Sequence, residues 1–96
     1  MAERVILGVV TEIDSRGNLV TNITAEMLAD VPTGETTTVT CDEHETCGLF
    51  RTEADQPAMT LIALIGSRGC LELAIVQDSA AMMLGVQAGT KVEVRW

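Results

Sequence analysis

The densest group of residues that could do chemistry lies at positions 41–47. Cys41, His44 and Cys47 follow one another at intervals of three residues, and Cys70 lies farther along the chain. Zinc accepts thiolate and imidazole ligands, but structural zinc sites usually hold their paired cysteines at a closer spacing. The acids between these residues are typical of a solvated hairpin tip, so we predict no metal site here.

Two enzymatic arrangements receive little support from the sequence. A cysteine nucleophile needs a histidine base, and His44 is the only histidine, with nothing nearby to orient it. The 14 acidic residues could supply a general acid and a general base, but most fall in turns or at outward positions of strands, where a solvated surface is the usual explanation. An independent enzyme or metal protein built on Cys41, His44 and Cys47 is therefore the least favoured hypothesis.

Two glycine-containing turns carry more informative polar groups. Residues 66–69, Gly-Ser-Arg-Gly, bring backbone amides, a hydroxyl and a guanidinium together, which suits a carboxylate or a phosphate. Residues 14–18, Asp-Ser-Arg-Gly-Asn, combine short polar side chains with a glycine, and such side chains most often hydrogen bond to their own backbone. Each segment is also what an ordinary hairpin turn looks like, so both explanations stay open.

Short β-branched segments surround these turns and predict a mostly β chain. Gly8, inside the first segment, predicts a bend or a bulge. Three hairpins are expected, through the turns at 14–18 and 66–69 and through an acidic loop at 42–45. The predicted strands cover residues 5–13, 19–21, 36–41, 47–52, 60–65, 71–76 and 90–95.

Helical structure is expected only as two short turns. Thr24 precedes good helix formers at 25–29, and Pro32 stops them. Ser79 caps residues 80–84, and Gly85 stands where a glycine ends a helix. Six or seven short strands with two helical turns predict an all-β fold, a small closed barrel or sandwich.

Length and composition limit the possible partners. The 96 residues suit one domain over positions 1–96, and a net charge of −8 disfavours nucleic acid. The only aromatic residues are Phe50 and Trp96, too few for a base-stacking platform. The apolar runs are too short to span a membrane, and with no signal peptide indicated we expect a cytoplasmic protein with reduced cysteines. Exposed apolar residues in so small a domain are candidates for homo-oligomer contacts.

The two turns and their flanking segments resemble the C-terminal domain of the S-adenosylmethionine hydroxide adenosyltransferase and 5′-halogenase (chlorinase, fluorinase) family. Residues 13–23, Ile-Asp-Ser-Arg-Gly-Asn-Leu-Val-Thr-Asn-Ile, are similar to its I-D-x-F-G-N-L-x-T-N motif. Residues 67–75, Ser-Arg-Gly-Cys-Leu-Glu-Leu-Ala-Ile, are similar to its closing N-S-x-G-x-L-E-I-A segment. The resemblance covers nearly the whole chain and implies a small antiparallel Greek-key β-barrel.

The resemblance also implies a function. Full-length enzymes of this family add an N-terminal domain with the catalytic acid, assemble as trimers, and bind their ligand between the N-terminal domain of one subunit and the C-terminal domain of its neighbour. This chain would form half of a pocket for S-adenosylmethionine or adenosine, with no other cofactor, and would be non-catalytic alone. A separate N-terminal-type chain would complete the site for hydrolysis of S-adenosylmethionine to adenosine and methionine. The alternative is a homo-oligomeric structural or protein-interaction barrel without nucleoside binding.

The family motif assigns roles residue by residue. Asn18 matches the asparagine at the adenine edge, and Asp14 matches an acid near the ammonium of the amino-acid moiety. Ser67 and Arg68 match the pair at the methionine carboxylate. Gln77 falls where a backbone group contacts adenine. For these roles to coexist, the two turns must meet at one rim of the barrel.

The chain also departs from the family pattern around these positions. Phe50 is the candidate for the aromatic ring that flanks the base. Arg16 replaces the phenylalanine of the first motif, which removes another ring, although a guanidinium can stack on a base. Gly66 replaces the asparagine before Ser67, which removes a side-chain amide.

Overall fold

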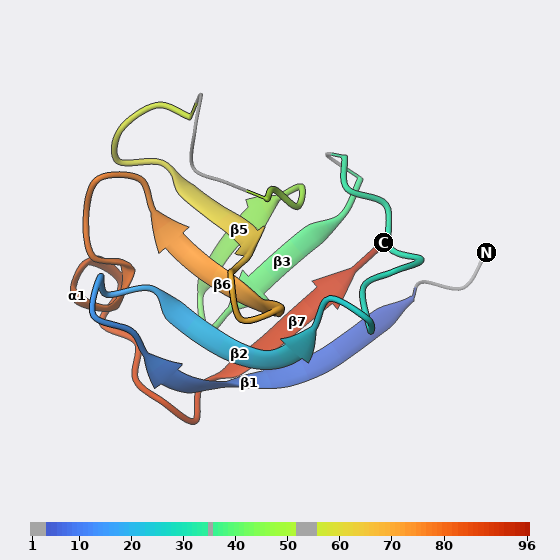
Figure 1. Ribbon diagram of the computed structural model, residues 1–96, viewed down its shortest axis with the longest axis horizontal. Helices are drawn as coiled ribbons and strands as arrows, with labels where there is room; N and C mark the ends of the chain where they lie inside the picture. The colour runs from blue at the N-terminus through green and yellow to red at the C-terminus, as the bar shows by residue number, and fades with distance from the viewer. Residues whose placement is uncertain (1–3, 35, 52–55) are drawn as a thin grey trace.

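The computed structural model describes residues 4–34, 36–51 and 56–96, and within these ranges it contains seven strands and one short helix (Figure 1). The elements are β1 (Val5–Ile13), β2 (Leu19–Thr24), β3 (Thr38–Cys41), β4 (His44–Cys47), β5 (Leu61–Ile65), β6 (Cys70–Ile75), α1 (Ala80–Leu84) and β7 (Lys91–Arg95).

The strands form one antiparallel sheet that curls into a nearly closed barrel (Figure 1). Their order is β4-β3-β7-β1-β2-β6-β5, so the last strand lies between the first and the third, as a Greek-key connection requires. The two edge strands meet where the Thr46 hydroxyl donates to the Leu61 carbonyl at 2.9 Å. The predicted all-β Greek-key barrel is confirmed.

Aliphatic side chains fill the barrel in place of aromatic rings. In β6, Leu71 and Leu73 are almost completely buried, as are Val92 and Val94 of β7. Alternation along a strand sends every second side chain to the same face, so these residues mark the inner face. Phe50 instead packs against a second cluster that contains Ile62, Leu64, Ala74 and Val76.

The turn between β1 and β2 rests on the start of α1. Ser79 caps this helix by accepting a hydrogen bond from the Met82 amide at 3.3 Å, and Gly85 ends it with φ of 66°. The Ala81 amide donates to the Gly17 carbonyl at 2.9 Å. Gly17 has φ of 85°, and a Cβ there would overlap Ser79, so this position needs a glycine for two reasons.

The second hairpin differs from its prediction. The segment expected to pair from residue 47 onward pairs earlier, as β4, with His44 opposite Cys41. The turn is therefore only two residues long, and Asp42 at φ of 56° takes the left-handed conformation that aspartate tolerates. Beyond Cys47 the chain leaves the ladder, and Thr52, the end of the predicted strand, lies outside the described residues.

The structure changes two smaller predictions, the bend or bulge at Gly8 and the helical turn after Thr24. The register of β1 shifts between Val10 and Glu12 and not at Gly8, which instead lets Ile23 approach the strand closely. The segment after Thr24 forms successive hydrogen-bonded turns, with the Met27 amide donating to the Thr24 hydroxyl at 3.2 Å, but no regular helix. No helix in the described part of the chain is long and apolar enough to cross a membrane.

Candidate functional site

The turns at 14–18 and 66–69 both line one hollow of about 360 Å³, which we call the main hollow. The antiparallel pairing of β2 with β6 sets Val20 opposite Glu72 and Thr24 opposite Cys70, so the two turns lie at opposite ends of these strands and the hollow extends between them. Glu72 alternates with the inward-facing Leu71 and Leu73, so the main hollow lies on the outer side of β6 and not at a barrel rim. It is lined by Asp14, Ser15, Arg16, Asn18, Arg51, Leu64, Ile65, Gly66, Ser67, Arg68 and Glu72.

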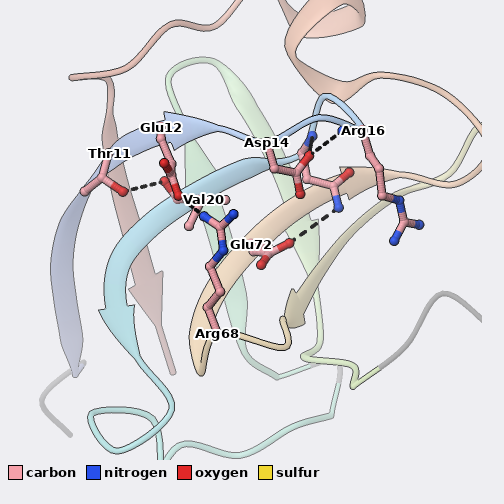
Figure 2. Close-up of polar contacts among 8 residues, drawn as sticks. Thr11, Glu12, Asp14, Arg16, Val20, Arg68 and Glu72 are labelled. Carbon is pink, nitrogen blue, oxygen red and sulfur yellow. Dashed lines mark hydrogen bonds and ion pairs between the residues drawn. The ribbon is translucent and has the colours of Figure 1, made fainter.

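A buried acid contacts Asn18 at this hollow. Glu72 is 6% exposed, and its Oε1 accepts a hydrogen bond from Asn18 Nδ2 at 3.4 Å (Figure 2). A Cβ at position 66 would overlap the Glu72 carboxylate. Gly66 therefore does more than remove an amide, because its missing side chain leaves the space that the carboxylate occupies.

Arg68 reaches across the surface to β1. Its guanidinium forms an ion pair with Glu12, and the two side chains are 58% and 53% exposed (Figure 2). Ion pairs this exposed contribute little to stability, since water already solvates both charges. A ligand carboxylate could therefore replace Glu12 at the guanidinium at small cost.

Asp14 acts first within its own turn. Its Oδ1 accepts hydrogen bonds from the backbone amides of Arg16, at 2.8 Å, and Asn18, at 2.9 Å. This is the local backbone role that short polar side chains usually have in glycine turns. Asp14 lines the main hollow, but the bonds it makes in this structure position the turn that carries Asn18.

Gln77 lies at an adjacent hollow of about 390 Å³, which we call the side hollow and which Asn18 and Arg16 also line. With φ of 64°, Gln77 adopts a conformation that is uncommon for a side-chain-bearing residue. The structure thus gathers five of the six predicted residues, Asp14, Asn18, Ser67, Arg68 and Gln77, around two neighbouring hollows.

Phe50 is the predicted site residue that lines neither of these hollows. Its backbone bridges to β5, with its amide donating to Ala63 and its carbonyl accepting from Ile65, both at 2.9 Å. Its next neighbour, Arg51, does line the main hollow. Arg51 and Glu72 were missed by the sequence argument. An acid inside an apolar strand was an available signal for Glu72, and Arg51 carried none.

The Cys-His-Cys group does not assemble into a site. Cys41 is buried in the core, and its burial, with a smaller effect of the Asp42 carboxylate, raises the pKa of its thiol to about 11. His44 Nε2 lies 3.2 Å from the Leu84 carbonyl oxygen, and Cys47 is exposed. In the described ranges no three His, Cys, Asp or Glu residues are grouped so that they could hold a metal ion.

Comparison with known proteins gives one family and several similar structures. A sequence model described as SAM hydroxide adenosyltransferase C-terminal domain matches residues 8–93. An uncharacterized conserved protein from Thermotoga maritima is 25% identical with a TM-score of 0.78, over 92% of this chain and 35% of its own. A conserved hypothetical protein from Thermus thermophilus is 30% identical with a TM-score of 0.74, over 92% and 34%. The chain spans about a third of each, and no curated protein matches it.

Proposed function

On the premise that the chain belongs to the SAM hydroxide adenosyltransferase C-terminal domain family, which its match over residues 8–93 shows, we propose that it forms one wall of a pocket for S-adenosylmethionine or adenosine. A separate N-terminal-type chain completes the pocket and supplies the groups that activate water. In the completed site, an oxygen from water bonds to the ribose 5′ carbon, the bond from that carbon to sulfur breaks, and its electron pair stays on sulfur. The products are adenosine and methionine, and water gives up a proton.

The observation that carries this proposal is that two turns far apart in the sequence line the same main hollow. Asn18 offers an amide that can both donate to and accept from an adenine edge. Ser67 and Arg68 offer a hydroxyl and a guanidinium for the methionine carboxylate. Three of the chain's six basic residues, Arg16, Arg51 and Arg68, line this hollow although the net charge is −8, which supports an anionic group on the ligand.

A calorimetric titration of the 96-residue chain with S-adenosylmethionine and with adenosine tests the proposal. The titrations are run on the chain alone and together with an N-terminal-type chain, and adenosine formation is followed in both. We expect binding without turnover by the chain alone, and turnover only in the mixture. If neither ligand binds in either arrangement at millimolar concentration, the proposal is wrong.

Replacing Arg68 separates the two ends of the ligand. We expect Arg68→Ala to weaken binding of S-adenosylmethionine by about tenfold or more, because a charge-assisted hydrogen bond contributes ~1.5 to 3 kcal/mol. Adenosine has no carboxylate, so its affinity should not change. Arg95→Ala is the matched control, since Arg95 also pairs with a glutamate but lies on β7. Equal losses for the two ligands would contradict the assignment of Arg68.

A homo-oligomeric barrel without nucleoside binding is the second candidate, and exposed apolar side chains favour it. Leu7 on β1 is 67% exposed, and Met82 on α1 is 85% exposed. Contact with another copy, in a trimer or a smaller assembly, would cover such residues. Size-exclusion chromatography with light scattering should then show an oligomer that Leu7→Glu or Met82→Glu dissociates. An unchanged monomer in all three proteins would remove this candidate.

A further inference from the structure

We propose that Glu72 is a positioning residue that selects a 6-amino purine over a 6-oxo purine in the main hollow. It does so by holding the Asn18 amide with its nitrogen toward the carboxylate and its oxygen available to the ligand. The inference rests on the proposed function, because it assumes that Asn18 meets the base. It adds to that function a determinant of base identity that does not itself touch the ligand.

Glu72 is an acid that is buried beside the main hollow. Glu72 is the only charged side chain among the buried residues that the structure describes. A buried carboxylate is costly unless hydrogen-bond donors compensate for its lost hydration. The amide of Asn18, itself only 4% exposed, lies within hydrogen-bond distance of it. Gly66 leaves room for the carboxylate beside this amide, so the contact depends on Asn18 and on two positions of the hairpin formed by β5 and β6.

The hydrogen bond between Asn18 and Glu72 has a defined direction. An ionised carboxylate can only accept, so the nitrogen of the Asn18 amide must face it. The backbone of Asn18 is already fixed, since its amide donates to Asp14 Oδ1 at 2.9 Å and its carbonyl accepts from the Asp14 amide at 3.1 Å. The remaining freedom is the flip of the side-chain amide, and the contact with Glu72 decides it. At 3.4 Å the bond is long, but a carboxylate at this distance still favours the nitrogen of the amide over its oxygen.

The orientation of the Asn18 amide affects which purine can pair with it. Asn18 lines both the main and the side hollow, so its amide oxygen is placed to accept from a group bound there. Adenine presents an exocyclic amino group, which donates. Hypoxanthine presents an oxygen at the same position, and two acceptors facing each other leave both unpaired. A site that requires a donor rejects such an analogue more strongly than a size difference would.

The test compares adenosine with inosine in an NMR titration of the full chain. We expect the wild type to bind adenosine at least about tenfold more tightly. In Glu72→Gln the neutral amide can donate or accept, so the flip of Asn18 is no longer fixed and the affinity ratio should fall toward one. Glu12→Gln is the matched control, because it removes an acid that pairs with Arg68 and not with Asn18, and its ratio should stay as in the wild type.

Equal binding of the two nucleosides by the wild type would overturn the inference and leave the proposed function standing. Binding of neither nucleoside, with or without the N-terminal-type chain, would overturn the inference, and the proposed function would fall with it only if S-adenosylmethionine also fails to bind. A ratio that falls as much in Glu12→Gln as in Glu72→Gln would also overturn it.

Should Glu72→Gln fail to fold, the side-chain amide protons of the two asparagines in the wild type still decide. We expect those of Asn18 to exchange with solvent more slowly than those of Asn22, which lies at an exposed position. Equal exchange rates would count against the contact.

Discussion

At the scale of single residues, Gly17 is the position where the turn at 14–18 packs against the start of α1. An alanine there would have to keep φ at 85° while its Cβ overlaps Ser79. We expect Gly17→Ala to lower the free energy of unfolding by about 2 to 4 kcal/mol, from left-handed strain and overpacking together. Gly89→Ala is the control, because φ is 96° but nothing lies near its Cβ. Urea unfolding measures both, and equal losses would contradict the overlap.

Cys41 carries a second prediction at this scale, on pH. Its thiol has a pKa of about 11 in the folded state against an ordinary 9.0, so between these values the unfolded chain has lost a proton that the folded chain keeps. The free energy of unfolding therefore falls as pH rises through this window, by at most about 2 to 3 kcal/mol. Urea unfolding at about pH 8 and about pH 10.5 should show a smaller fall for Cys41→Ala than for the wild type. Cys47→Ala, at an exposed thiol, should follow the wild type, and parallel curves for all three proteins would refute the prediction.

At the scale of elements, a side-chain hydrogen bond contributes to the closure of the barrel. β4 and β5 meet through the hydrogen bond from the Thr46 hydroxyl to the Leu61 carbonyl. We expect Thr46→Val to lower the free energy of unfolding by about 1 kcal/mol and to speed hydrogen exchange at the amides of β5. Thr38→Val, within the ladder between β4 and β7, is the control and should leave β5 protected. Unchanged exchange in Thr46→Val would show that the seam is held by other contacts.

The elements also show what the sequence could and could not predict. The turns at 14–18 and 66–69 were predictable because their signals are local, with Gly17 and Gly69 both at positive φ. The start of β4 at His44 was missed because a two-residue turn depends on the conformation of Asp42, which no pattern in the strands reports.

Glu72 could not be placed from its own segment. An acid in a strand is expected to face water, and its burial here depends on Asn18, which is 54 positions away, and on the space above Gly66. The motifs identified both turns, but the pairing of β2 with β6 places them at opposite ends of these strands, and the hollow they share lies between them on the outer side of β6.

At the scale of the whole molecule, the excess of acids works against the compact state. The net charge is −8, and the radius of gyration is 12.1 Å, close to the ~10 Å screening length in 0.1 M salt. At about 0.01 M salt this length is ~30 Å, so charges on opposite sides of the barrel repel each other. Raising sodium chloride from about 0.01 to 0.2 M should therefore raise Tm by about 2 to 8 °C, if screening relieves ~0.5 to 1 kcal/mol.

Two variants test whether this response of Tm to salt comes from the negative net charge. Neutralising the exposed acids of the second hairpin (Asp42→Asn, Glu43→Gln and Glu45→Gln together) should reduce the rise in Tm, because it removes charge without touching the core. Lys91→Gln removes an exposed cation and should enlarge the rise, because the negative excess grows. Thermal unfolding followed by circular dichroism at both salt concentrations measures all three proteins. If Tm responds equally to salt in all of them, or falls, repulsion between the acids is not what limits the stability of the barrel.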